Sequence, residues 1–201
     1  MEVFSGMLVS RWVRRFRSYL VSPPLIFALL WYRWEVEVET LTWLLGICLV
    51  LMGMILRIWA QQHLHYRHSL KFKKQLTTTG PYSFVRNPLY IGNIMLCLGV
   101  TVASEILWLV PITFLYGLWI YSLVVQYEEA HLREKYGEPY RRYLTEVPRW
   151  VPSFGSFKKL GLKTLGLKNE YLRHSIFAEI HCLFLLVPYI FKELVSLWIA
   201  N

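Results

Sequence analysis

Long apolar runs separated by short polar segments set the pattern of this 201-residue chain. The core of a lipid bilayer offers the backbone no hydrogen-bonding partner, so an apolar run of about 20 residues predicts a membrane-spanning helix. Five runs approach this length, at residues 19–34, 41–60, 88–104, 106–127 and 175–198. The pattern therefore predicts an all-α fold: an integral membrane helical bundle of about five transmembrane helices with cytosolic amphipathic helices.

The five runs differ in how well they fit a span. The second run contains one charged residue, Arg57, and the fourth contains none, whereas the third is at the short end of the spanning range. In the first run, Pro23 and Pro24 are expected to kink the helix or to set its start. The last run carries two glutamates and a lysine, so an interfacial helix is the alternative for this segment.

The apolar runs and the segments around them divide the chain into three expected parts. Residues 1–18 place apolar side chains at helical spacing among arginines, which predicts a helix lying on the membrane surface. Residues 19–155 form the expected membrane domain. Residues 156–201 are expected to form a cytosolic amphipathic segment followed by a C-terminal span.

Composition and charge support a multi-pass integral membrane protein. Apolar residues make up 55% of the chain and charged residues 17%, whereas soluble domains carry about 25% charged residues. Of the 22 lysines and arginines, all but Arg33 and Lys192 fall on one side of the predicted spans, which places that side and the N-terminus in the cytosol. The membrane is the cell membrane if the chain is prokaryotic and the endoplasmic reticulum if it is eukaryotic. The net charge of +9 fits this topology and contact with membrane lipids, not nucleic acid.

Histidines and cysteines do not follow the spacing of a metal site. Three histidines lie together in the segment HLHYRH at residues 63–68, but the chain has only six in total and no second such cluster. Each of the three cysteines stands alone inside a predicted span and is expected to act as a small apolar residue. We therefore expect no metal.

The segment TTTGPYSFVRNPLYIG at residues 77–92 is the first that contains candidate functional residues. Gly80 and Pro81 predict a turn, and Asn87 and Pro88 predict a helix start in which Asn87 caps the free backbone N–H groups. A turn and a cap explain those four residues.

The turn and the cap do not explain why Tyr82, Arg86 and Tyr90 converge on the same helix start. The N-terminus of a helix carries partial positive charge and unpaired N–H donors, so it suits a carboxylate or another anion.

The second such segment is QYEEAHLREKYGEPYRRYLTEVPRWVPSF at residues 126–154. Glu128 and Glu129 follow directly on a long uncharged run, and carboxylates at a membrane boundary are costly unless they are paired or functional. The alternative is that they only end the span at the water interface. The later part of the segment predicts a broken amphipathic helix on the cytosolic surface.

In this order, GPYSFVRNPLYIG and then EEAHLREKYGEPYRRYLTEVPRWVP closely resemble the isoprenylcysteine carboxyl methyltransferase family, to which the phospholipid N-methyltransferases are similar. The resemblance covers roughly residues 60–155 and implies S-adenosylmethionine as cofactor, bound in a cytosol-facing pocket. The cofactor-binding residues that it implies are Lys74, Gln75, Leu76, Thr77, Tyr82, Asn87, Pro88, Leu89, Tyr90 and Glu128. The catalytic residues that it implies are Glu128, Tyr90 and Arg86. A carboxylate and aromatic faces suit a sulfonium cation.

The chain departs from the family pattern at three places. Asn87 replaces a histidine, and it cannot titrate near neutral pH. Val124 replaces the basic residue that holds the substrate carboxylate in the prenylcysteine enzymes. The segment after residue 155 is an addition, which shapes a different acceptor site or serves only as an anchor.

The resemblance implies a membrane methyltransferase that acts on a lipid-like acceptor, an isoprenylcysteine carboxylate or a lipid headgroup. The expected partners are membrane lipids and this acceptor, while the oligomeric state stays open. One alternative is an NADPH-dependent membrane sterol or steroid reductase, which has a similar Gly-x-Tyr pattern but usually a Gly-Glu pair where this chain has Gly92 and Asn93. The other is a non-catalytic membrane scaffold.

Overall fold

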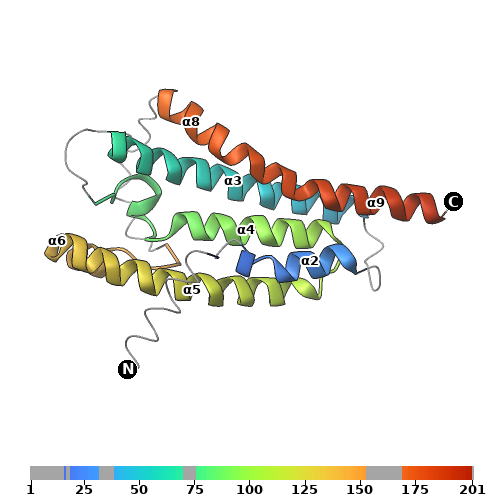
Figure 1. Cartoon of the computed structure of the whole chain (residues 1–201), viewed down its shortest axis with the longest axis horizontal. Coiled ribbons are helices and arrows are strands. Elements are labelled where there is room, and N and C mark those ends of the chain that lie inside the picture. Colours follow the sequence, from blue (N-terminus) through green and yellow to red (C-terminus); the bar gives the residue numbers. More distant parts are fainter. Residues whose placement is uncertain (1–15, 17–18, 32–38, 70–75, 153–168, 201) are drawn as a thin grey trace.

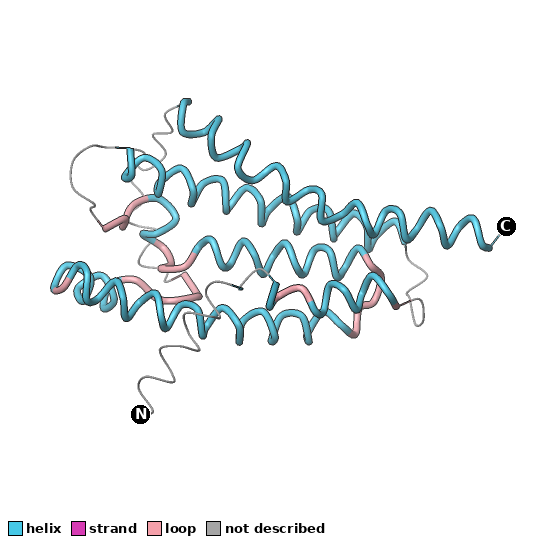
Figure 2. Tube along the Cα trace, viewed as in Figure 1, coloured by secondary structure: helices cyan, strands magenta, loops and turns pink. Residues whose placement is uncertain are grey.

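The structure is a computed structural model that describes residues 16, 19–31, 39–69, 76–152 and 169–200 (Figure 1). Every regular element of these residues is a helix (Figure 2), so the predicted all-α fold is confirmed. The elements are α2 (Pro23–Leu30), α3 (Glu39–Ser69), η1 (Gly80–Ser83), α4 (Pro88–Ala103), α5 (Leu109–Tyr136), α6 (Glu138–Glu146), α8 (Asn169–Glu179), η3 (Ile180–Leu186) and α9 (Val187–Ala200). The predicted surface helix at residues 1–18 lies almost entirely outside the described residues, as does the amphipathic segment after residue 155.

Three helical stretches of the described residues are long and apolar enough to cross a membrane: Thr40–Leu64, Leu109–Tyr136 and Leu172–Val195. Helix α4 has 16 residues and α2 has eight. At about 1.5 Å per residue, neither short helix alone covers a hydrocarbon core of about 30 Å. Pro23 is the first residue of α2, so the proline pair sets the start of this helix. The five predicted runs thus correspond to three long helices and two short ones packed among them.

Helices α3 and α4 run side by side in opposite directions and approach closely through paired glycines (Figure 1). A Cβ atom on Gly46 would lie 2.6 Å from the carbonyl oxygen of Gly99, and one on Gly53 would lie 2.8 Å from that of Gly92. Small residues are the usual means by which two membrane helices bring their backbones together. The glycine pairs therefore fix α4, which begins at the pocket described below, against the long helix α3.

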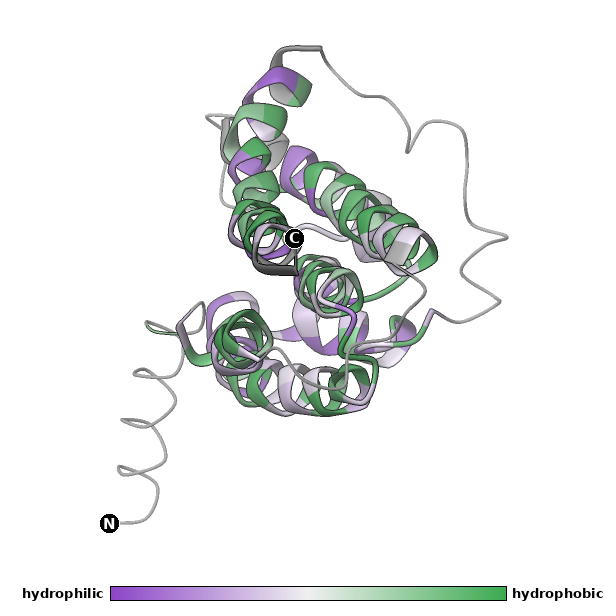
Figure 3. Cartoon of the chain, turned by 90° about the vertical axis from the view of Figure 1, so that its right-hand side faces the viewer, coloured by the Kyte–Doolittle hydropathy of each residue, from purple (hydrophilic) through white to green (hydrophobic). Residues whose placement is uncertain are grey.

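Helix α5 packs on the other side of α4, and α2 packs against both. Many large apolar side chains of these helices are exposed, and much of their ribbon is coloured as hydrophobic in Figure 3. Leu44 and Ile55 on α3 and Leu115 and Trp119 on α5 are all exposed. An apolar outer surface of this extent fits contact with lipid tails.

The C-terminal unit, defined as α8, η3 and α9, is tied to the rest of the bundle by polar contacts. The hydroxyl of Tyr189 donates a hydrogen bond to the carbonyl oxygen of Leu25 at 2.6 Å, and Lys192 donates one to that of Trp31 at 2.7 Å. Arg57 of α3 forms an ion pair with Glu179 of α8 at 2.6 Å. These contacts compensate the cost of polar groups within apolar surroundings and hold the unit against α2 and α3.

Helix α5 ends where the chain folds back into α6 (Figure 1). Gly137 joins the two helices with a φ of 60°, in the left-handed region that favours glycine. Helix α6 buries Tyr140 and Tyr143, which pack against Leu132 and Tyr136 of α5 among other side chains. The predicted break in this amphipathic segment is therefore confirmed.

Candidate active site

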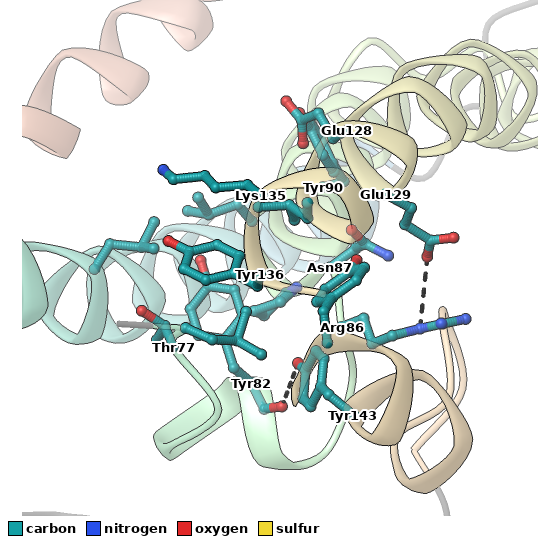
Figure 4. Close-up of a pocket in the computed structure, with 16 residues that line it drawn as sticks. Thr77, Tyr82, Arg86, Asn87, Tyr90, Glu128, Glu129, Lys135, Tyr136 and Tyr143 are labelled. Atoms are coloured by element: carbon teal, nitrogen blue, oxygen red, sulfur yellow. Dashed lines mark hydrogen bonds and ion pairs between the residues drawn. The ribbon is translucent and has the colours of Figure 1, made fainter. Parts of the chain in front are cut away.

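A pocket of about 380 Å³ lies at the end of the bundle where α4 begins and α5 ends (Figure 4). It is lined by Leu64, Leu76, Thr77, Tyr82, Arg86, Asn87, Pro88, Leu89, Tyr90, Glu128, Glu129, Leu132, Lys135, Tyr136, Tyr140 and Tyr143. Much of the lining comes from the two segments with candidate functional residues, 77–92 and 126–154, which are far apart in sequence. The turn after residue 77 and the end of α5 thus meet at one end of the bundle.

The turn at Gly80 positions the first side of the pocket. Gly80 has a φ of 63°, and a Cβ atom there would collide with the ring of His63. The short helix η1 that follows buries Tyr82, whose carbonyl oxygen accepts a hydrogen bond of 2.7 Å from the hydroxyl of Tyr143 (Figure 4). This bond joins η1 to α6 across the pocket.

Helix α4 begins at the predicted place, with Asn87 before its first residue, Pro88. The predicted capping role of Asn87 is wrong, because its side chain makes no hydrogen bond to the first turn of α4. The side-chain amide donates instead to the carbonyl oxygen of Arg149 at 3.3 Å. The side chain therefore contacts the segment that follows α6 and not the first turn of α4.

Tyr90 and Glu128 form the central polar contact of the pocket. The hydroxyl of Tyr90 on α4 donates a hydrogen bond of 2.8 Å to a carboxylate oxygen of Glu128 on α5. The ring of Tyr90 packs against Tyr121, with 4.9 Å between the ring centroids. Two residues that sequence analysis assigned to one site are thus in direct contact.

Glu129, the next residue of α5, makes different contacts. Arg149 binds both of its carboxylate oxygens, through Nη2 at 2.6 Å and Nε at 3.1 Å. The Nε atom of Arg86 lies 3.6 Å from the same carboxylate (Figure 4). The hydrogen bond to Glu129 raises the pKa of the Arg149 guanidinium. The Glu129 carboxylate is therefore buried between two guanidinium groups.

The tyrosines from η1 and α6 that line the pocket are held in the neutral form. Burial raises the pKa of Tyr82 and of Tyr143 above the ordinary value of a phenol, and it raises the pKa of Tyr140 to about 12. Desolvation disfavours the phenolate. These side chains can therefore donate hydrogen bonds but are poor bases near neutral pH.

Nine of the predicted site residues line this pocket, including all three of the expected catalytic residues. They are Leu76, Thr77, Tyr82, Arg86, Asn87, Pro88, Leu89, Tyr90 and Glu128. Lys74 and Gln75 lie outside the described residues. The structure brings the nine together, while their roles toward a cofactor stay a prediction.

Sequence analysis did not assign several lining residues. Tyr140 and Tyr143 could have been found from the spacing in the segment GEPYRRY at residues 137–143, since residues three apart share a helix face. Leu132, Lys135 and Tyr136 have no comparable signal. They line the pocket because α5 continues as a helix beyond its apolar run and α6 folds back beside it.

Val124, which replaces a basic residue of the prenylcysteine enzymes, is fully buried in an apolar cluster with Tyr90 and Tyr121. It is not among the pocket-lining residues. In the part of the chain that the structure describes, the C-terminal unit contributes no side chain to the lining either. Neither Val124 nor the described part of the C-terminal unit therefore places a charge in the pocket.

Comparison with known proteins identifies related sequences. Residues 41–139 match the model of the phospholipid methyltransferase family. The nickel-cobalt-cadmium resistance protein NccN of Alcaligenes xylosoxydans xylosoxydans is 29% identical over 113 residues, which are 56% of this chain and 51% of that protein. The cobalt-zinc-cadmium resistance protein CzcN of Cupriavidus metallidurans is 27% identical over 127 residues, 63% of this chain and 56% of that protein.

A plant enzyme matches a stretch of this chain of similar length. Protein-S-isoprenylcysteine O-methyltransferase B of Arabidopsis thaliana is 27% identical over 117 residues, 53% of this chain and 57% of that protein. The chain thus spans just over half the length of the curated relatives that it matches. The resemblance predicted from the motifs is confirmed: residues 41–139, just under half of the chain, match the phospholipid methyltransferase family.

Proposed function

We propose that this protein is an integral membrane methyltransferase that moves the methyl group of S-adenosylmethionine to a lipid-like acceptor. One observation carries the proposal: the pocket joins the Tyr90–Glu128 contact, Arg86 and the start of α4 in one place. The family match over residues 41–139 supports the same reaction class.

The chemistry of the pocket fits this cofactor. Its volume of about 380 Å³ lies within the range of small-molecule sites, which is roughly 300–1,000 Å³. Glu128 offers a carboxylate to a sulfonium cation, and tyrosine rings offer faces that attract cations. Arg86 and the N-terminus of α4 suit the carboxylate of the methionine part. Leucine side chains from four segments supply an apolar surface for the adenine ring.

S-adenosylmethionine supplies an activated methyl group that an acceptor displaces in line. The residues of the chain then act mainly by alignment and by placing charge. Tyr90 orients the carboxylate of Glu128 through its hydrogen bond, and the neutral tyrosines donate hydrogen bonds without taking up protons. A carboxylate or thiolate acceptor requires no base, whereas an amine acceptor loses a proton and Glu128 is the carboxylate available for it.

The lipid-like acceptor enters from the bilayer, and the cofactor enters from the cytosol. The apolar outer surface of the bundle and the basic segments at the pocket end support this arrangement. Because Val124 puts no cation beside the pocket, a carboxylate acceptor has no partner at that position. Membrane lipids are the proposed partners, in the cell membrane of a prokaryote or the endoplasmic reticulum of a eukaryote.

Two of the relatives, NccN and CzcN, are named as metal resistance proteins. We do not propose this role for the present chain. Among the described residues there is no group of three or more histidine, cysteine, aspartate or glutamate side chains that could hold a metal ion. The proposal therefore rests on the pocket and on the family.

The test is methyl transfer by the purified protein in lipid nanodiscs. The protein is incubated with isotope-labelled S-adenosylmethionine and a membrane lipid extract, and the products are separated by mass spectrometry. Labelled lipid or lipid-like product is the expected result. In parallel, the protein is titrated with S-adenosylmethionine and with NADPH. Binding of NADPH alone would support the reductase alternative, and binding of neither would support the scaffold.

A further inference from the structure

The segment that follows α6, here called the strap (residues 147–150), runs across the start of α4. The backbone N–H of Arg86 donates a hydrogen bond of 2.9 Å to the carbonyl oxygen of Pro148. The carbonyl oxygen of Arg149 accepts the bond from the Asn87 side chain. Trp150 packs against the apolar cluster to which Tyr90 belongs. The strap therefore contacts the two residues that precede α4 and are part of the pocket lining.

The strap is also fastened to α5, through the paired hydrogen bonds from Arg149 to Glu129. A two-point contact between a guanidinium and a carboxylate fixes orientation as well as distance. Glu129 is 4% exposed, and Arg86 adds a second positive charge beside it. Both oxygens of this carboxylate are thus in contact with arginine side chains.

Consecutive residues of an α-helix point about 100° apart, because the helix has 3.6 residues per turn. Glu128 and Glu129 therefore contact different neighbours, although they lie in the same turn of α5. Glu128 contacts Tyr90, while Glu129 contacts the strap and, through it, the segment that carries Arg86. A shift of the strap would move Arg86 and the start of α4 relative to Glu128.

We infer that Glu129 and Arg149 are positioning residues, which set the distance between Glu128 on α5 and the anion-binding start of α4. This inference rests on the proposed function, because the cofactor would be held between those two points. A buried ion pair adds little net stability over an apolar pair of similar size, so stability alone does not explain this one. The side-chain amide of Asn87 donates to the strap as well, which adds a further contact between the strap and the start of α4.

The test is a double-mutant cycle with Glu129→Gln, Arg149→Met and the double variant, all in lipid nanodiscs. The dissociation constant for S-adenosylmethionine is measured by calorimetry. Each single variant is expected to weaken binding by about tenfold, and the double variant by no more than the worse single one, because both remove the same contact. Arg149→Lys keeps the charge but loses the paired geometry, so it should bind with intermediate affinity.

One further measurement and one control variant separate positioning from general instability and from failure of the proposed function. Deuterium exchange at the Arg86 amide requires no cofactor and should become faster in all three variants. Arg141→Met is the matched control, because Arg141 is exposed and lies outside the pocket lining. It should change neither quantity.

Additive losses of affinity, or unchanged exchange at Arg86, would overturn the inference. If the unmutated protein binds no S-adenosylmethionine, the proposed function fails and the inference fails with it. If that protein binds and the variants bind equally well, only the inference fails.

Discussion

Two buried glutamates of this protein make nearly the same contact in two different regions. Glu129 binds Arg149 at 2.6 Å at the pocket end of the bundle. Glu179 binds Arg57 at 2.6 Å between α8 and α3, and Gln61 donates a second hydrogen bond to it at 3.1 Å. Both carboxylates are almost inaccessible to solvent.

The two pairs differ in what they connect. The Glu129 pair joins α5 to the strap and reaches Arg86, which lines the pocket. The Glu179 pair joins α3 to the C-terminal unit, and neither its two residues nor Gln61 lines the pocket. A buried ion pair in a membrane protein is often a sign of function. The comparison teaches that burial alone does not identify a site and that contact with the pocket lining does.

Loss of the second pair should produce the largest effect on stability. Arg57→Met leaves the buried carboxylate of Glu179 without its cation, which is expected to lower the free energy of unfolding by about 3–5 kcal/mol. The affinity of the folded protein for S-adenosylmethionine should not change. Thermal unfolding in nanodiscs measures the first quantity and calorimetry the second.

A compensating variant provides the control for this prediction. Arg57→Met combined with Glu179→Leu replaces the pair by apolar side chains and should recover most of the lost stability. If the double variant unfolds as readily as Arg57→Met, the unpaired charge is not the cause. A loss of cofactor affinity in the folded double variant would contradict the separation of the two regions.

A smaller effect is expected where α3 and α4 meet. Gly92→Ala places a Cβ atom where it would meet Arg57 and the carbonyl oxygen of Gly53, both within 3 Å. Overpacking of this kind costs about 1–3 kcal/mol. Gly117→Ala is the matched control, because a Cβ atom there would meet only Ile94 at an ordinary 3.5 Å. Equal melting temperatures for the two variants would contradict the close packing of these helices.

The apolar runs predicted the helices well but not their ends. The run at residues 106–127 became α5, which continues through a charged segment to Tyr136 and ends at Gly137. Helix propensity continues beyond the apolar run, and the left-handed backbone of the glycine ends the helix. The run at residues 19–34 contains the eight-residue helix α2, because the prolines delay its start.

The site was predictable where the family motifs assign both residues and not where a contact depends on how the chain folds back. Tyr90 and Glu128 were assigned together through the order of the family motifs, and they are in contact. The pairing of Glu129 with Arg149 depends on how α6 folds back, which no local pattern encodes. The same region bears on the wrong prediction for Asn87, whose side-chain amide donates to the carbonyl oxygen of Arg149 and does not cap α4.

The central claim is that the pocket around Glu128, and not the buried pair around Glu179, binds the methyl donor. Calorimetric titration of S-adenosylmethionine into nanodiscs tests it directly, with the unmutated protein, Glu128→Ala and Glu179→Gln side by side. We predict that the unmutated protein and Glu179→Gln bind with the same affinity and that Glu128→Ala does not bind. Unchanged affinity in Glu128→Ala would contradict the account.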